Sequence, residues 1–220
     1  MTAGTLTSVT AERLGDASPQ LLAPGGTQWA KVSETTVSLA PTPLDAQPSA
    51  YVQTSWAGRP YGALASVGLS AVVAGDALYL RLRWAAAEPR QAISDNDTYA
   101  DACAVLFPLD GKTAELATMG DERSPVQGWH WRAGTALPFV ITATGLGTVS
   151  RVPDHPVSVG AAWENGSWSV AFKRGLSEQG VPLTAGASVP LGIAVWSGAN
   201  SERAGLKAHT PAWLTLTLPK

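Results

Sequence analysis

The fold is decided by VSVGAAWENGSWSVAFKR, the stretch that occupies residues 157–174. Apolar and polar side chains alternate on either side of Asn165-Gly166, a dipeptide typical of two-residue hairpin turns. We therefore expect one strand from Val157 to Trp163 and an antiparallel partner from Trp168 to Arg174. No other part of the chain carries a hairpin pattern as strong.

The same pattern recurs outside this stretch. Residues 65–73 alternate, Gly75-Asp76 marks a turn, and residues 78–84 alternate again with their leucines and Trp84 on one face. Further strands are expected at residues 102–107, 128–133, 189–196 and 213–218. Many short strands with turns between them and no strong helical period predict an all-β fold. We expect an antiparallel, immunoglobulin-like β-sandwich with few short helices.

The N-terminal part of the chain is more weakly patterned. We expect a helical turn at residues 11–14, short strands at residues 29–32 and 37–40, and a loop through the prolines that follow. The length of 220 residues indicates a single domain, 1–220. Within it, residues 1–60 are expected to form N-terminal strands and loops, and residues 61–220 the main core.

Composition excludes several classes of protein. Glycine and proline number 22 and 16, which indicates many turns and argues against a helical bundle. The net charge is −2 and there is no basic run, so nucleic-acid binding is not expected. No apolar stretch approaches the ~20 residues of a membrane span. The single cysteine excludes a disulfide framework, a multi-cysteine zinc or iron–sulfur site and covalently attached haem.

The first residues show no leader. Met1-Thr2-Ala3-Gly4 has neither a basic region nor an apolar core of the secretory type. Two interpretations stay open at this point: a cytoplasmic protein, or a mature chain with an added methionine.

Motifs of catalysis are absent from the sequence. There is no Gly-x-Ser-x-Gly, no His-Glu-x-x-His, no P-loop and no Gly-x-Gly-x-x-Gly. Cys103 stands in an apolar run and is expected to be an inert core thiol. Nine tryptophans are either core side chains, sugar-stacking platforms or walls around a flat cofactor. Met119, the one methionine besides Met1, is either a packing residue or an axial iron ligand.

Three blocks of sequence resemble a known family. The first is DTYADACAVLFP at residues 97–108, and the second joins Met119-Gly120 to WHWRA at residues 129–133. The third is AVWSG at residues 194–198 followed by RAGLKA at residues 203–208 and by Trp213. In this order they resemble the haem b-binding gamma subunits of molybdenum enzymes of the dimethyl sulfoxide reductase superfamily. That group comprises the subunits of ethylbenzene dehydrogenase, dimethyl sulfide dehydrogenase, selenate reductase and chlorate reductase.

The resemblance implies a site and a fold. In that family a methionine and a lysine hold the iron, and the matching residues here are Met119 and Lys207. It also implies a β-sandwich similar to the cytochrome domain of cellobiose dehydrogenase. The cofactor would be a non-covalent haem b. Cys103 stands where the family more often has a small aliphatic residue.

Histidines are alternative candidates for the iron ligands. His209 is two residues from Lys207, so both side chains would point to one face of a strand, and His209 is the runner-up ligand. His130 is also a candidate and is expected to face away from its tryptophan neighbours. The walls of the pocket are expected to be Trp129, Trp131, Trp196 and Leu206, with Arg203 or Arg132 beside a haem propionate.

The function implied is electron transfer without catalysis. By resemblance, the chain would pass electrons between the iron–sulfur subunit of a molybdenum enzyme and a soluble carrier such as a c-type cytochrome. Its partners would be that iron–sulfur subunit and the molybdenum catalytic subunit. A periplasmic location is expected, with the signal peptide removed. The alternative is a carbohydrate-binding or scaffold module, which predicts exposed coplanar tryptophans.

Overall fold

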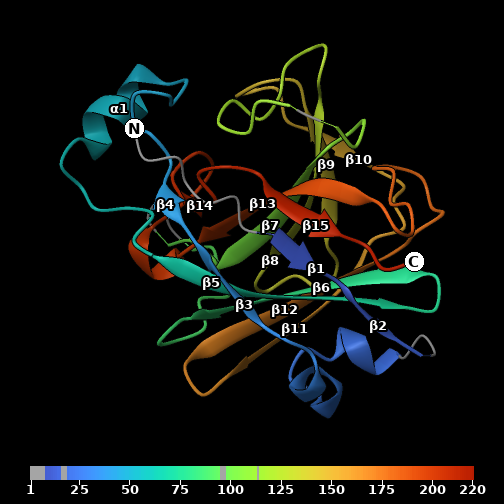
Figure 1. Ribbon diagram of the computed structural model, residues 1–220. Helices are drawn as coiled ribbons and strands as arrows, with labels where there is room; N and C mark the ends of the chain where they lie inside the picture. Colours follow the sequence, from blue (N-terminus) through green and yellow to red (C-terminus); the bar gives the residue numbers. More distant parts are fainter. Residues whose placement is uncertain (1–7, 16–18, 95–97, 113) are drawn as a thin grey trace.

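In the computed structural model, two β-sheets pack face to face in a sandwich (Figure 1). The structure describes residues 8–15, 19–94, 98–112 and 114–220. Residues 1–4, at which a leader was sought in the sequence, and Asp97, the first residue of the family-like blocks, lie outside the described residues. The expected all-β sandwich with few short helices is confirmed.

The first sheet carries the candidate site. Its central path runs in the order β1-β15-β13-β7-β8-β9-β10, and β14 pairs with both β13 and β4 at its side. The strand bounds are β1 Ser8–Thr10, β4 Ala40–Pro41, β7 Ala102–Pro108, β8 Val126–Arg132, β9 Phe139–Ala143, β10 Ser150–Val152, β13 Ser188–Trp196, β14 Ala208–His209 and β15 Leu214–Thr217.

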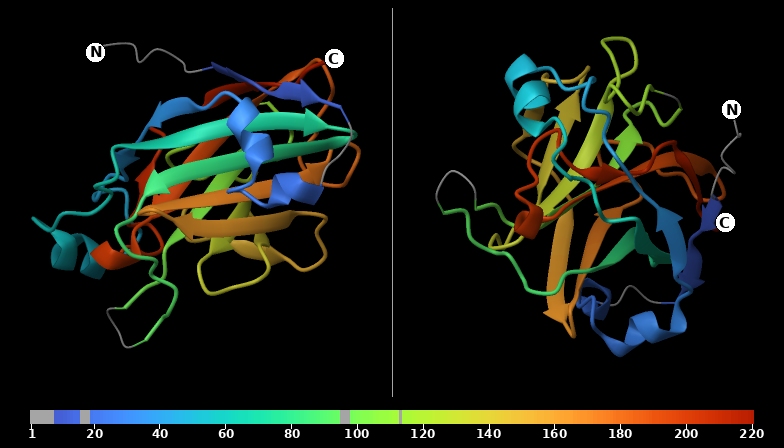
Figure 2. Two further views of the ribbon diagram at one scale, coloured as in Figure 1. Left: turned by 90° about the horizontal axis from the view of Figure 1, so that it is seen from below. Right: turned by 90° about the vertical axis from the view of Figure 1, so that its left-hand side faces the viewer.

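The second sheet runs in the order β11-β12-β6-β5-β2, with β3 paired to β5. Its bounds are β2 Glu12–Leu14, β3 Thr35–Ser38, β5 Ser66–Ala74, β6 Ala77–Ala85, β11 Ser158–Glu164 and β12 Ser167–Gly175. The strands pair antiparallel, except that β1 runs parallel to β15 and β2 parallel to β5. The 3₁₀ helices η1 (Pro19–Leu22) and η2 (Thr27–Lys31) cover its outer face (Figure 2).

The predicted hairpin is confirmed in position and register. Trp163 lies opposite Trp168 across the β11–β12 turn. Asn165 and Gly166 have φ angles of 50° and 74°, the left-handed pair that a type I′ turn requires. The β5–β6 hairpin is confirmed as well, and alternate residues of β6 from Leu78 to Trp84 are buried between the sheets.

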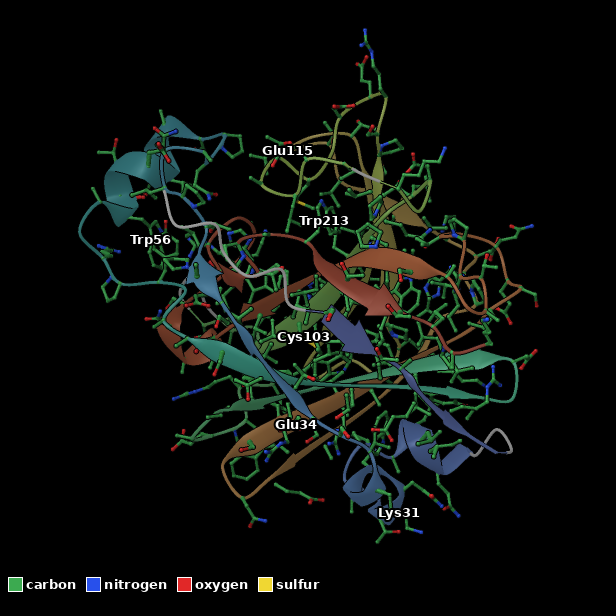
Figure 3. The ribbon with its side chains drawn as sticks, viewed as in Figure 1. Lys31, Glu34, Trp56, Cys103, Glu115 and Trp213 are labelled. Carbon is green, nitrogen blue, oxygen red and sulfur yellow. The ribbon has the colours of Figure 1, made fainter. Side chains whose placement is uncertain are left out.

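Tryptophans fill much of the space between the two sheets. The ring of Trp131 from the first sheet meets Trp84 and Trp168 of the second, with ring centroids 6.3 and 4.9 Å apart. Trp129 packs on Phe107 at 4.9 Å. Cys103 lies in the same layer (Figure 3) and is fully buried, which confirms the expectation of a core thiol.

The N-terminal predictions were less accurate. Residues 12–14 form a strand rather than a helical turn, because their backbone pairs with β5. The stretch around Trp29 is 3₁₀ helix rather than strand, because the Trp29 Nε1–H donates to the Leu21 carbonyl across η1 and η2. The loop expected through Pro41, Pro43 and Pro48 is confirmed at residues 42–49. It is followed by α1 (Ala50–Trp56), which is capped by the Ser49 hydroxyl, the acceptor of a hydrogen bond from the Val52 N–H. In the described part of the chain, no helix has the length and apolar character needed to cross a membrane.

Candidate functional site

A cavity of about 490 Å³ lies on the outer face of the first sheet. Alternate residues of three neighbouring strands form its floor, and they are Ala104 and Leu106 of β7, Gly128 and His130 of β8, and Phe139 and Ile141 of β9. The outer face of a sandwich sheet is ordinarily polar because it meets water. Here it is apolar, and the volume lies within the range of small-molecule sites, about 300–1,000 Å³.

Gly128 keeps the floor flat. A Cβ atom at this position would lie 3.0 Å from Ile141 Cγ1 and 3.2 Å from Leu106 Cδ1. A side chain here would therefore push the neighbouring residues apart or rise into the cavity. Together with Ala104, this glycine leaves room for a broad ligand over β7 and β8.

The walls come from segments that are distant in sequence. Residues 42–52, which lead into α1, stand on one side, and the loops after β7 and β9 stand on the other (Figure 1). The loop between β13 and β14 supplies Arg203, Leu206 and Lys207. The cavity is thus assembled by the tertiary fold and by no single motif.

Met119 enters the cavity from the loop between β7 and β8. Its φ angle is +60°, a left-handed conformation that is uncommon outside glycine. The turn is held by hydrogen bonds from Met119 N–H to the Leu116 carbonyl, 3.1 Å, and from Gly120 N–H to the Glu115 carbonyl, 2.7 Å. The same loop is tied to the sheet by Trp213, whose Nε1–H donates to the Ala114 carbonyl at 2.7 Å beside Glu115 (Figure 3).

Lys207 reaches the cavity from the loop between β13 and β14. Its Nζ atom lies 5.4 Å from the centre of the Trp196 ring, and it forms no ion pair with any described carboxylate. Burial lowers the pKa of Lys207 from 10.5 to about 8, because desolvation disfavours the charged amine. The Lys207 carbonyl accepts a hydrogen bond from Thr42 N–H at 3.1 Å, which fixes the backbone beside the amine.

A buried carboxylate, Glu202, shapes the loop that carries Lys207. Its Oε1 accepts from Gly62 N–H at 2.7 Å and from Asn200 Nδ2 at 2.9 Å, and its Oε2 accepts from Ser197 N–H at 2.9 Å. Charge-assisted hydrogen bonds of this kind are among the strongest in proteins. Glu202 therefore connects the β13–β14 loop to the chain ahead of β5.

His130 stands in a row of rings on the cavity floor. Its ring stacks on Phe139 with centroids 4.2 Å apart and lies 5.0 Å from Trp196. The Nδ1 atom of His130 is buried and has no hydrogen-bond partner among the described residues. Burial, followed by the charges of Arg132, Lys207 and Arg151, lowers the pKa of His130 to about 3. The imidazole is therefore neutral at physiological pH.

The structure brings together most of the residues singled out in the sequence. Met119, Lys207, Trp196 and Leu206 line one cavity, together with Arg203 and both candidate histidines. Burial first, and then the charge of Lys207, lowers the pKa of His209. Trp129 and Trp131, which we expected as walls, do not line it: strand alternation turns them into the core while His130 faces the cavity. Arg132 is not a lining residue either.

Sequence reasoning missed the floor and the α1 side of the cavity. Neither Leu106 nor Phe139 was singled out, and neither were Thr42, Gln47 and Val52. A signal for the floor existed in residues 102–107, where apolar residues occupy both faces of the strand. Such a run indicates a strand buried on both sides, and here the second covered side is the cavity.

The chain's relationship to known proteins agrees with this geometry. The profile of the family described as ethylbenzene dehydrogenase matches residues 27–155. The chain belongs to the ethylbenzene dehydrogenase family. The match begins before the family-like core that we expected at residue 61, and it contains Met119 but not Lys207.

Three curated relatives place the chain within the group identified from its sequence. It is 38% identical to chlorate reductase subunit gamma of Ideonella dechloratans, over 66% of this chain and 62% of the relative. It is 32% identical to a putative respiratory nitrate reductase heme subunit of Haloferax mediterranei (60% and 48%). It is 26% identical to dimethylsulfide dehydrogenase subunit gamma of Rhodovulum sulfidophilum (62% and 54%). The chain spans less than two thirds of the length of each relative.

A solved structure supports the fold of this family member. A putative carbohydrate-binding protein of Bacteroides uniformis superposes with a TM-score of 0.56 over 96% of this chain and 99% of its own. The identity is 9%, so the likeness concerns the β-sandwich alone. All nine tryptophans lie in the described part of the chain and none of them is exposed. The exposed coplanar platforms expected of a carbohydrate-binding module are therefore absent from that part.

Proposed function

We propose that this chain is an electron-transfer subunit that binds one haem b non-covalently in the cavity on the first sheet. Met119 and Lys207 would be the axial ligands of the iron. The observation that carries this proposal is the convergence of one thioether and one unpaired, partly desolvated amine on a single apolar cavity. The name of the Haloferax mediterranei relative, a heme subunit, supports the same cofactor.

The chemistry of the donors suits a haem iron. A lysine binds a metal only as the neutral amine, so it must lose its proton. The lowered pKa of Lys207 reduces the cost of that loss relative to an exposed lysine. A thioether ligand stabilises ferrous iron and raises the reduction potential. The floor of Ala104, Gly128 and Leu106 offers a flat apolar face to a macrocycle.

We propose electron transfer rather than catalysis because the protein would supply two ligands to the iron. The bound haem would supply a one-electron couple between ferric and ferrous iron. If Met119 and Lys207, from two different loops, both held the iron, no coordination position would be left for a substrate. Arg203 lines the same cavity and is a cation suited to a propionate. The role of this chain is therefore to hold and insulate the carrier, and we propose no catalytic residue.

The names of the relatives suggest the setting of this subunit. Two of them are gamma subunits, one of a reductase and one of a dehydrogenase. We propose that the chain joins a molybdenum catalytic subunit and an iron–sulfur subunit, and exchanges electrons with a soluble carrier such as a c-type cytochrome. The proposed location is the periplasm.

The test is the visible absorption spectrum of the haem-reconstituted chain, oxidised and then reduced with dithionite. We expect a low-spin b-type spectrum in the unmodified protein. Met119→Leu keeps the volume and removes the thioether, and Lys207→Ala removes the amine. Each should convert the spectrum to a high-spin form. A protein that stays colourless after addition of haem would contradict the proposal.

Control variants distinguish the loss of an iron ligand from a general disruption of the folded protein. Lys31→Ala removes an exposed lysine beneath the second sheet, far from the cavity side of the molecule (Figure 3), and should leave the spectrum unchanged. His209→Ala tests the rival ligand. If Lys207→Ala leaves the spectrum intact while His209→Ala changes it, the second ligand is His209 and the assignment of Lys207 is wrong.

A further inference from the structure

A second hollow opens at the end of the sandwich, on the other face of β8 and β9. Its volume is about 920 Å³, and it lies between β8, β9 and β12 and the loops after β10 and β12. Gln127 and Val140 point into it, whereas their neighbours Gly128 and Ile141 point into the haem cavity. The two spaces therefore lie on opposite faces of the same two strands.

A buried arginine forms the inner end of this hollow. Arg174 of β12 is only 1% exposed and forms no ion pair with any described carboxylate. Its Nε–H donates to the Gly175 carbonyl at 3.2 Å and its Nη2 to the Val181 carbonyl at 2.5 Å. Its Nη1 is buried with no hydrogen-bond partner among the described residues.

A buried cation is unfavourable for a protein unless an opposite charge and hydrogen bonds compensate for the water that it loses. Burial lowers the pKa of the Arg174 guanidinium, and the charge of Glu178 opposes this only in part. Stacking of the Arg174 guanidinium 5.5 Å from the centre of the Trp129 ring compensates part of this cost. The free Nη1 still has two N–H groups that fit the oxygens of a carboxylate.

The space beside Arg174 is kept open. Gly180 lies next to it, and a Cβ atom there would be 2.7 Å from Gln127 Oε1, 3.0 Å from Arg174 Nη1 and 3.2 Å from Gln127 Nε2. The Gln127 Oε1 atom already accepts hydrogen bonds from Trp129 Nε1 and Val181 N–H, and the Gln127 NH₂ group borders the same space. His155 lines the hollow as well, and its Nδ1 has no partner among the described residues.

The other residues that line the hollow indicate what the rest of the ligand is like. They are apolar and rich in proline, with Val140, Val157 and Pro138 inside and Leu137, 76% exposed, at the mouth. Asp154 and Glu178 are exposed on the rim, and their negative charges oppose the entry of a multiply charged anion. A ligand with one negative charge and an apolar body matches the apolar interior and Arg174. It is also repelled less by the acidic rim than a multiply charged anion.

We infer that this hollow is a binding site for a monocarboxylate with an apolar body, and that Arg174 binds the carboxylate. The site is independent of the haem cavity, so the failure of either proposal leaves the other intact. Gln127 would donate to the second oxygen, and Trp129 would hold the guanidinium in place from below.

The test uses the full chain and benzoate at constant ionic strength, with chloride as the balancing anion. We expect saturable binding by calorimetry, weaker binding of acetate and no saturable binding of sulfate. The three histidines report the location, because His155 lines this hollow and both others line the haem cavity. Benzoate should shift the ¹H–¹⁵N imidazole signals of His155 and leave those of His130 and His209 in place.

A variant with a built-in carboxylate gives the decisive comparison. Gln127→Glu is nearly isosteric and places a negative charge beside Arg174. We expect it to lower benzoate affinity at least tenfold and to raise the melting temperature of the ligand-free protein. Lys207→Ala, which removes the cation of the other cavity, should bind benzoate as the unmodified chain does. Absence of saturable binding, signal shifts at His130 instead of His155, or undiminished affinity in Gln127→Glu would overturn the inference.

Discussion

Lys207 and Met119 illustrate how single residues are held in costly states at this cavity. Lys207 is an amine moved out of water with no ion-pair partner among the described carboxylates, and Met119 is a non-glycine residue at φ +60°. Ser201 and Ala204, in the loop that leads to Lys207, also have positive φ angles. Each such backbone conformation costs on the order of 1–2 kcal/mol. Strain that collects on the two loops carrying the proposed ligands indicates that these loops are shaped for binding.

His130 makes the haem-free protein sensitive to acid. Its pKa is about 3 in the folded chain and near 6.5 when unfolded, so between these pH values the unfolded state binds the extra proton. Stability should therefore fall as the pH drops from 6.5 toward 3. We expect His130→Phe to remove about 2 kcal/mol of the loss between pH 7.5 and pH 4.5.

The measurement is urea unfolding of both proteins at the two pH values. The phenylalanine can stack on Phe139 as the imidazole does, and the Nδ1 atom that it replaces has no hydrogen-bond partner within the described ranges of the chain. An identical pH dependence in the two proteins would show that His130 is protonated equally in the folded and unfolded states.

Among the structural elements, the hairpins could be predicted from the sequence, and most N-terminal segments could not; the strand expected at residues 37–40 is an exception, because β3 and β4 overlap it. The pairing of β11 with β12 is determined by local sequence, because the turn residues and the alternating apolar and polar side chains belong to the same eighteen residues. The strands near the N-terminus are specified by distant partners instead: β1 pairs with β15 and β2 with β5. Their own residues carry little period, so composition alone suggested a helical turn at residues 11–14.

The candidate site could be predicted only in part from the pattern of residues. Met119 and Lys207 came from the family resemblance, since no periodicity relates a loop after β7 to a loop after β13. Strand alternation at residues 129–131 did predict that His130 faces away from its tryptophan neighbours. It could not say which face of β8 carries the cavity, and this is why Trp129 and Trp131 were assigned to the wrong side.

The β13–β14 loop should depend on Glu202. Glu202→Gln keeps the size of the side chain but sets an NH₂ group against donors that now approach a carboxylate. We expect the free energy of unfolding to fall by about 2–3 kcal/mol. Haem affinity should fall as well, because Leu206 and Lys207 lie on this loop. Denaturant unfolding and haem titration measure the two effects.

A matched control shows whether burial is the cause. Glu88 pairs with Arg90 at 3.3 Å, but both side chains are exposed. Exposed pairs contribute about 0–1 kcal/mol, so Glu88→Gln should change the stability little. Equal losses in the two variants would contradict the anchoring role of Glu202.

Across the whole molecule, each sheet has part of its outer face covered. On the second sheet η1 and η2 form the cover, and on the first sheet the segments around the proposed haem cavity form it. Asp101 connects the layers: its Oδ2 accepts from Trp168 Nε1 of the second sheet at 2.8 Å, and its Oδ1 accepts from Gly198 N–H beyond β13 at 2.9 Å. Asp101 therefore ties the second sheet to the segment that follows β13.

The reactivity of Cys103 can show whether the core between the sheets becomes exposed only when the whole chain unfolds. It is fully buried between the sheets, and burial raises the pKa of its thiol well above the usual value. A thiol reagent needs the exposed thiolate, so Cys103 should react only from an unfolded chain. We expect its labelling rate to rise with urea in parallel with global unfolding measured by tryptophan fluorescence. Labelling in the absence of denaturant at the rate of a free thiol would mean that the two sheets separate locally, and that the core does not insulate the proposed haem site.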